Sequence, residues 1–274
     1  QHARSAMTGL DELLKKPLDQ PEEGEMAHCP TLTGHYDLRN VQYTYDEENV
    51  KNVLHIGQLQ IKPGERIALL GKVGAGKSTL LKLLAGQAKA SQGKVIVDGV
   101  DINRIDPVDL RRQLGWLSQD SRLFFGTLRQ NLMLGNPHAS EQEMLQALRV
   151  SGALSLVQQD AASLDRIINE GGRGLSGGQR QMVLISRMIL RQPQVVLLDE
   201  PTASMDEQLE EHVIRQMKGW LSGRTLVLVT HRPALLKLVD RIVVMDNGRI
   251  VADGPRDKIL RSAGAARPNK GDAA

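Results

Sequence analysis

The strongest constraint on the fold is a glycine-rich segment, GKVGAGKS, at residues 71–78. It follows the apolar run RIALL, which is typical of a buried strand, and precedes TLLKLLAG, which has helical spacing and ends at a glycine. A loop of this pattern bends so that successive backbone N–H groups point at a polyphosphate. The free N–H groups at the start of the following helix also favour an anion. The sequence therefore predicts an α/β domain that binds a polyphosphate. The candidate contacts are Gly71, Lys72, Val73, Gly74, Ala75, Gly76, Lys77, Ser78 and Thr79.

The side chains of this loop and a second apolar run, VVLLDE, indicate a nucleotide and a metal ion. Lys77 is placed to contact the β- and γ-phosphates, and Ser78 offers a hydroxyl to Mg²⁺. Asp199 ends the second run, where it can reach Mg²⁺, and Glu200 follows it, where it can polarise a water that attacks the γ-phosphate. An apolar run ending in Asp-Glu is common by itself, but together with the phosphate loop it predicts ATP and Mg²⁺ as cofactors.

A second glycine-rich helix start, LSGGQ, lies 99 positions downstream, counted from Lys77 to Ser176. Ser176 and Gln179 form the pattern of a capping box. Gly177 and Gly178 are not explained by capping, because glycine in a helix costs about 1 kcal/mol against alanine. We therefore expect something to come close to this backbone, and the free N–H groups predict a second anion site.

Composition excludes several classes of protein. The 274 residues carry 35 basic and 32 acidic side chains, a net charge of +3, and no basic stripe, so no nucleic-acid partner is expected. The single cysteine, Cys29, rules out an internal disulfide framework. No apolar run reaches the roughly 18 residues that a membrane-spanning helix needs. The chain begins with Gln1, which suggests a piece of a longer protein.

The pattern along the chain predicts three parts. Residues 1–30 read as a short helix followed by a linker rich in proline and acid. Residues 31–262 alternate strands and helices, with a mostly helical insert over about 121–193 that includes a helix near 154–162. Residues 263–274, within the small and polar segment from Arg261, are expected to be disordered.

The motifs occur in the order and spacing of ATP-binding cassette (ABC) proteins. The resemblance rests on the loop at 71–79, Gln119 in WLSQD, LSGGQRQ, VVLLDEPT, the Ser204–Met205–Asp206 segment and His231, and covers about residues 32–262. It implies a phosphate-loop NTPase cassette: a mixed central sheet, an antiparallel β-subdomain and a helical subdomain carrying LSGGQ. It also implies a head-to-tail dimer in which LSGGQ of one subunit binds the γ-phosphate of the ATP held by the other.

The resemblance assigns roles to particular residues. Tyr45 matches the aromatic residue that stacks on adenine, although Tyr43 is an alternative on the same strand face. Glu200 matches the general base, His231 the switch histidine, and Gln119 the glutamine near Mg²⁺ that also faces the membrane partner. The predicted catalytic set is Glu200, His231, Lys77 and Gln119. The predicted metal ligands are Ser78, Gln119 and Asp199, and the residues of the second anion site are Ser176, Gly177, Gly178 and Gln179.

Further segments resemble exporters of the type I secretion class, which moves RTX toxins and large adhesins. These segments are LFFGTLRQNL, INEGGRGLSGGQRQ with Glu170, and ARSAMTGLDELLKKP, which resembles the end of a transmembrane domain. The resemblance implies ATP hydrolysis coupled to protein secretion at the cytoplasmic face of the bacterial inner membrane. It implies four kinds of partner: a second copy, a transmembrane domain of the same parent chain, a periplasmic adaptor and an outer-membrane channel.

Other classes of function remain open or are disfavoured. A cassette of a lipid, drug or peptide exporter is the main alternative, because substrate choice lies in the membrane domain. A soluble non-transport ABC ATPase is disfavoured, because relatives in chromosome maintenance carry hundreds of coiled-coil residues between the two glycine-rich segments. A non-hydrolysing module is disfavoured because Glu200, LSGGQ and His231 are all present. Met205 and LISRMIL depart from the usual leucine and alanine-rich forms, as apolar replacements at packing positions.

Overall fold

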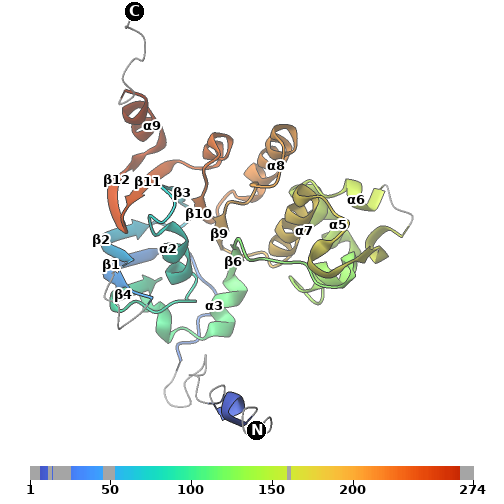
Figure 1. Cartoon of the computed structure of the whole chain (residues 1–274), viewed down its shortest axis with the longest axis horizontal. Helices are drawn as coiled ribbons and strands as arrows, with labels where there is room; N and C mark the ends of the chain where they lie inside the picture. Colours follow the sequence, from blue (N-terminus) through green and yellow to red (C-terminus); the bar gives the residue numbers. More distant parts are fainter. Residues whose placement is uncertain (1–6, 12–13, 15–25, 46–52, 159–161, 266–274) are drawn as a thin grey trace, which may run out of the picture.

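The computed structural model describes residues 7–11, 14, 26–45, 53–158 and 162–265. Two lobes lie side by side (Figure 1): one is built on β-sheets, and the other holds helices α4 to α7. This arrangement agrees with the predicted α/β domain interrupted by a helical insert, and the connections between the lobes run through β6 and α7.

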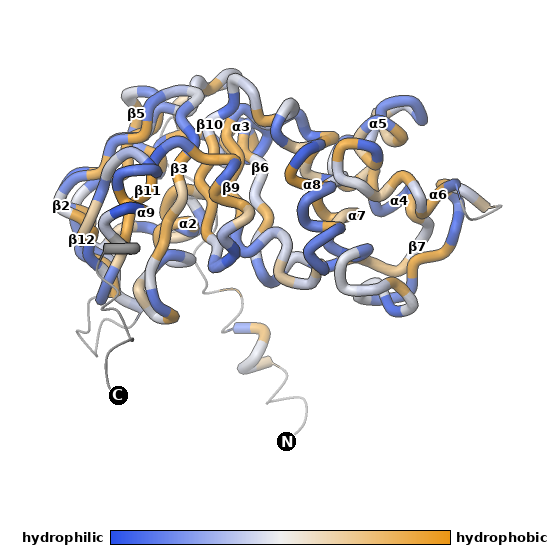
Figure 2. Tube along the Cα trace, turned by 90° about the horizontal axis from the view of Figure 1, so that it is seen from above, coloured by the Kyte–Doolittle hydropathy of each residue, from blue (hydrophilic) through white to orange (hydrophobic). Residues whose placement is uncertain are grey.

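The larger sheet has six strands in the order β12-β11-β3-β10-β9-β6. Strands β11, β3, β10, β9 and β6 run parallel, and β12 pairs antiparallel with β11. The central strands β9 and β10 are buried along their whole length, as expected for parallel strands covered on both faces. Figure 2 shows that these strands are mainly hydrophobic. The bounds are β3 Arg66–Leu70, β6 Leu114–Leu117, β9 Val195–Asp199, β10 Thr225–Val229, β11 Arg241–Asp246 and β12 Arg249–Pro255.

A second sheet is antiparallel, in the order β2-β1-β4-β5, and confirms the predicted β-subdomain. Its bounds are β1 Tyr36–Tyr43, β2 Leu54–Ile61, β4 Gln92–Val97 and β5 Val100–Asp101. Helix α2, Lys77–Leu84, shares one buried apolar cluster with strands of both sheets. The start of α2 is therefore fixed from two sides, which positions the phosphate loop before it. Nearby, η1 spans Ile102–Arg104 and α3 spans Pro107–Gln113.

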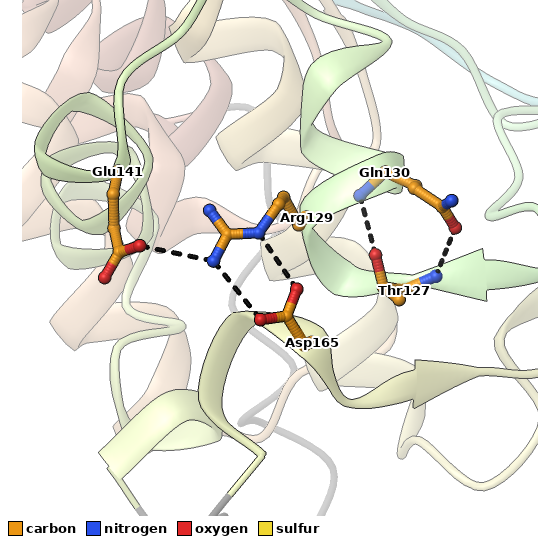
Figure 3. A network of polar contacts seen from close by, with 5 residues as sticks. All are labelled: Thr127, Arg129, Gln130, Glu141 and Asp165. Carbon is orange, nitrogen blue, oxygen red and sulfur yellow. Dashed lines mark hydrogen bonds and ion pairs between the residues drawn. The ribbon is translucent and has the colours of Figure 1, made fainter.

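The helical lobe is stabilised by local caps and by ion pairs between its elements. The capping box predicted at Ser176 is present, Ser140 with Glu143 forms a second, and Thr127 with Gln130 makes a third (Figure 3). Arg129 of α4 bonds Asp165 and Glu141, which joins three separate segments. The bounds are β7 Gly126–Thr127, α4 Leu128–Met133, α5 Glu141–Ser151, α6 Ser155–Gln158, η2 Ser163–Asp165, β8 Ile167–Ile168, η3 Glu170–Gly172 and α7 Gly177–Leu190.

Two expectations need correction or fall partly outside the described residues. The helix predicted near 154–162 is seen only as the single turn α6, and residues 159–161 lie outside the described part. The tail expected to be disordered from residue 263 starts later, because helix α9, Arg256–Ala265, continues through residues 263–265. The remaining tail residues, 266–274, lie outside the described ranges. Between these regions, α8 spans Glu207–Trp220 and η4 spans Pro233–Leu238.

The N-terminal segment is described only in part. Residues 7–11 and 14 are helical and exposed, as predicted, and the other residues up to 25 lie outside the description. Met26–Cys29 contact the sheet lobe through a bridge between Ala27 and Ile105. Within the described ranges, no helix has the length and apolar character needed to cross a membrane.

Candidate functional site: a phosphate loop and an acidic strand end at one cavity

The phosphate loop joins β3 to α2 and needs glycine at two crowded positions. A Cβ atom on Gly71 would lie 2.2 Å from the carbonyl oxygen of Met245, and one on Gly76 would lie 2.6 Å from Cδ2 of Leu54. Gly76 is also the N-cap of α2, with a φ of 93°, and no side chain caps this helix end. The first N–H groups of α2 are therefore available to an anion, as the sequence predicts.

Lys77 lies over the loop, with its side chain buried. Its Nζ donates hydrogen bonds to the carbonyl oxygens of Gly71 at 2.7 Å and Lys72 at 2.8 Å. Burial lowers the pKa of the Lys77 ammonium, and the nearby carboxylates of Glu200 and Asp199 partly oppose this effect. The loop thus holds a desolvated cation next to free N–H groups, which is a strong site for phosphate.

A cavity of about 570 Å³ opens at this loop and brings most of the predicted residues together. Its lining comes from the phosphate loop, from the ends of β9 and β10, and from the segments before β2 and after β6. The residues are Tyr45, Val53, Val73, Gly74, Ala75, Gly76, Lys77, Ser78, Thr79, Gln119, Asp199, Glu200, Val229 and His231. Because β3, β9 and β10 are parallel neighbours, their carboxyl ends meet at this one edge of the sheet.

Asp199 ends β9 and is buried at the cavity wall. Burial raises the pKa of its carboxyl group, while a hydrogen bond from the Ser78 hydroxyl and the charge of Lys77 oppose the rise. Its Oδ1 is buried without a hydrogen-bond partner among the described residues. An orphan carboxylate oxygen beside a serine hydroxyl, with the Gln119 amide on the same cavity, fits the oxygen ligands that Mg²⁺ prefers.

Glu200 follows Asp199 in a left-handed conformation, with a φ of 50°, which is costly for a residue with a side chain. Its backbone N–H donates to the carbonyl oxygen of Val229, which ties this turn to the end of β10. Nε2 of His231 lies 3.7 Å from Oε1 of Glu200, and the Thr230 hydroxyl lies 3.5 Å from Oε2 of Glu200. The fold thus places a carboxylate and an imidazole side by side at the cavity.

Two tyrosines compete for the role of the aromatic contact, and their surroundings differ. Tyr45 lines the cavity with 60% of its surface exposed, and its hydroxyl lies 2.8 Å from Oγ1 of Thr79. Tyr43 is partly buried against the apolar core and meets Tyr45 edge to face, with ring centroids 5.0 Å apart. Tyr45 presents the exposed ring, so it stays the favoured candidate for stacking on a base.

The LSGGQ segment lies outside the cavity of its own chain, since none of its residues lines that cavity among those described. The interpretation of its glycines also changes. A Cβ on Gly177 would lie 2.7 Å from Cβ of Ser204, and one on Gly178 would lie 2.8 Å from Cδ2 of Leu209. Close packing within the chain therefore offers a second explanation for both glycines, beside the approach of an external ligand. Ser176 itself is exposed and open to a partner.

Sequence reasoning missed the buried contacts behind the site. Glu210 of α8 and Arg232, which follows His231, form an ion pair with an O–N distance of 3.5 Å. Neither residue belongs to a motif quoted above, and the two lie 22 positions apart. The sequence shows only an acidic residue one turn after Asp206, which does not reveal its burial or identify a partner.

The fold and the cavity define a nucleotide-binding α/β domain with a phosphate loop. A family model described as "ABC transporter" matches residues 54–203, more than half of the chain. The chain belongs to the ABC transporter family. The resemblance drawn from the motifs is thereby confirmed, and the similarity to transporter ATP-binding proteins implies ATPase activity.

Curated relatives and a solved structure agree with this assignment. The chain is 37% identical to the cyclolysin secretion/processing ATP-binding protein CyaB of Bordetella pertussis over 88% of its own length and 34% of the relative's. It is 34% identical to the leukotoxin translocation ATP-binding protein LktB of Mannheimia glucosida, over 96% of its own length and 37% of the length of LktB. The structure of a bacterial Atm1-family ABC exporter with ATP bound superposes with a TM-score of 0.87 at 29% identity. The match covers 98% of this chain and 47% of the exporter chain. The chain spans about a third of the length of these two secretion proteins.

Proposed function

We propose that this chain is the ATP-hydrolysing domain of a membrane exporter, of the kind that serves type I protein secretion. The observation that carries the proposal is the convergence at one cavity of the Lys77 loop, Asp199, Glu200 and His231. A phosphate-binding loop alone would support nucleotide binding. The carboxylate and imidazole beside it support hydrolysis.

The proposed reaction uses residues of the cavity in separate roles. Lys77 and the N–H groups of α2 hold the β- and γ-phosphates, and Tyr45 stacks on adenine. Glu200 accepts a proton from the attacking water, and His231, 3.7 Å from Glu200, supports the γ-phosphate. Ser78, Asp199 and Gln119 would hold Mg²⁺, which neutralises charge developing on the phosphate oxygens.

The second anion site calls for another copy of the chain. Ser176–Gln179 lies away from the cavity of its own chain, yet the Ser176 side of the helix start is exposed. In a head-to-tail dimer, each LSGGQ segment would close the open side of the cavity of the other subunit. Two ATP molecules would then be buried at the interface, and hydrolysis would release the two halves.

The proposed partners and location follow from the relatives. CyaB and LktB are named for toxin secretion and translocation, and each is about three times the length of this chain. We infer that the parent protein carries a transmembrane domain at the bacterial inner membrane. A periplasmic adaptor and an outer-membrane channel would complete a secretion path for an RTX-type toxin or adhesin.

Light scattering on Glu200→Gln tests the dimer and the base together. This variant keeps the ATP-binding groups and removes the base, so we expect Mg-ATP to double the mass from 30.1 kDa while turnover is lost. Glu211→Gln, on the exposed face of α8, is the control and should hydrolyse ATP normally. Normal turnover in Glu200→Gln would refute its role as base, and a monomer with bound ATP would contradict dimerisation of this chain by itself.

Deletion of the gene for the full-length parent tests the exported class. The proposal expects the loss of a large secreted protein from the culture medium, restored by the wild-type gene but not by a Glu200→Gln version. An unchanged set of secreted proteins, together with altered lipid content or drug resistance, would instead support the alternative exporter classes.

A further inference from the structure

Glu210 is a buried acidic side chain that the proposed reaction does not use. It lies on α8, one helical turn after the Asp206 cap, and only 4% of its surface is exposed. Its carboxylate accepts a hydrogen bond from the buried Thr202 hydroxyl and pairs with the Arg232 guanidinium at 3.5 Å. A buried carboxylate needs such partners, because removing it from water is unfavourable. The pairing therefore holds three chain segments together.

Arg232 contacts two of these segments at once. Besides the ion pair with Glu210, its Nη2 donates to the carbonyl oxygen of Ala203 at 3.0 Å. Its backbone N–H donates to the Thr230 hydroxyl at 2.9 Å, which fixes the turn at the end of β10. The planar guanidinium can reach a carboxylate and a carbonyl together, which an ammonium group does less well.

Arg232 lies on the segment that carries His231 and thereby links it to the segment that follows Glu200. Ala203 follows Glu200 closely, and its N–H donates to the Glu200 carbonyl oxygen at 3.2 Å. His231 precedes Arg232 directly, and its side chain is half exposed. The position of the His231 side chain is therefore set mainly by its own backbone. Arg232, the next residue, connects this backbone to α8 through Glu210.

We propose that Glu210 and Arg232 are positioning residues for hydrolysis, which set His231 at its distance from Glu200. The ion pair fixes the turn that carries His231 against the segment that follows Glu200. This inference rests on the proposed function, since it assumes that these two side chains act on the γ-phosphate and its attacking water. Small displacements of a reacting group have large effects on rate, which is why such support matters.

The same two elements carry a matched control pair. Glu211 of α8 and Lys237 of η4 form an ion pair at 3.7 Å, with both side chains well exposed. This pair also joins α8 to the region after His231, but no contact seen in the described residues links it to the turn of His231 or to the segment after Glu200. Removing this exposed pair tests whether the loss of any contact between α8 and η4 is sufficient to lower kcat.

The experiment compares kcat, the ATP dissociation constant and the melting temperature of the 274-residue chain and its variants. The variants are Glu210→Gln, Arg232→Lys, Glu211→Gln and Lys237→Gln. We expect Glu210→Gln and Arg232→Lys to lower kcat by about tenfold with little change in ATP affinity. The two control variants should keep the wild-type kcat. Should Glu210→Gln fold poorly, Arg232→Lys keeps the charge pair and tests the geometry by itself.

A second series in a His231→Ala background separates positioning from a merely structural role. If the pair acts through His231, Glu210→Gln will lower kcat no further once His231 is absent. A full tenfold additional loss in that background would overturn the proposal, and so would a kcat of Glu210→Gln equal to that of Glu211→Gln. If the wild-type chain binds ATP but does not hydrolyse it, the proposed function has failed. If the wild-type chain hydrolyses ATP but the Glu210 and Arg232 variants behave like the controls, only the positioning role of the pair has failed.

Discussion

Two helices of this domain begin beside glycines, and their N-termini are completed differently. Helix α2 starts after Gly76, and no side chain caps it. Helix α7 starts after Ser176, whose hydroxyl accepts the Gln179 N–H while the Gln179 side chain accepts the Ser176 N–H. The N–H groups at the start of α2 therefore stay available to a ligand. At the start of α7, the capping box already satisfies part of the N–H groups.

The surroundings of the two ends differ in the same sense. The α2 terminus opens on a cavity with Lys77 and the acidic end of β9. The first turn of α7 packs Gly177 and Gly178 against Ser204 and Leu209 of the same chain. Crowding within the chain explains glycine at both helix starts, so the two ends differ in their caps: the uncapped N–H groups of α2 face the cavity, and α7 is capped by Ser176. Among the described residues, the cavity at the α2 terminus is lined from several segments of the chain, and the α7 terminus lies outside it.

The largest effect is expected at the α2 terminus, for Lys77→Ala. Hydrogen bonds to charged groups are worth about 1.5–3 kcal/mol, so the ATP dissociation constant should rise by roughly 10- to 150-fold. Calorimetric titration of ATP measures it. Lys94→Ala, at an exposed position of β4 that does not line the cavity, is the control and should bind ATP as the wild type does. Equal affinities for wild type and Lys77→Ala would mean that the loop does not hold the phosphates.

Tyr45→Ala tests whether the cavity at the α2 terminus also binds the adenine of ATP. Stacking of a base on an aromatic ring is worth about 1–3 kcal/mol, so ATP affinity should fall by about tenfold. Tyr43→Ala removes the partly buried ring and should have a smaller effect on affinity. A larger loss of affinity in Tyr43→Ala would reverse the assignment, and the same titrations decide between them.

The packing explanation for the α7 terminus is tested with Gly177→Ala. Its Cβ would lie 2.7 Å from Cβ of Ser204, and overpacking of this kind costs about 1–3 kcal/mol of unfolding free energy. The double variant Gly177→Ala/Ser204→Gly should recover most of the loss in urea denaturation. Gly219→Ala in α8 has open space and should gain stability. A gain in Gly177→Ala as well would remove the packing explanation.

The smallest expected effect is on stability, for Asp199→Asn. The folded-state pKa of Asp199 lies above 3.8, the ordinary value of an aspartate carboxyl, so the folded chain binds this proton more tightly than the unfolded chain. The contribution of Asp199 to stability is therefore greatest below pH 3.8 and declines as the pH rises through the raised pKa. Above the raised pKa the ionised group is unfavourable, and its neutral replacement should raise Tm there by about 2–4 °C without Mg²⁺.

Asp199→Asn should also lose Mg²⁺-dependent ATP hydrolysis, which separates its role in the site from its effect on the fold. Asp246→Asn is the matched control, because Asp246 ends β11 of the same sheet but is exposed. Its Tm should stay unchanged. A lower Tm for Asp199→Asn than for the wild type would show that the buried charge is favourable overall.

The elements that could be predicted are those set by neighbours in the sequence. The strand before the phosphate loop and the capping box at Ser176 both depend on residues a few positions apart. Segments with weak local signals were predicted less well. Helix α6 is a single turn in the described residues, and α9 continues through residues that composition alone marked as disordered.

The sequence by itself determined that this chain has a phosphate loop, an acidic strand end and a second glycine-rich helix start, because each is encoded in a short run of residues. Only the tertiary structure decided how they meet. The order of β3, β10 and β9 brings Lys77, Asp199 and His231 to one cavity, although 154 positions separate the first from the last. It also places Ser204 against Gly177 and Arg232 against Glu210. Contacts of this range depend on which strands and helices become neighbours, and no local pattern records that choice.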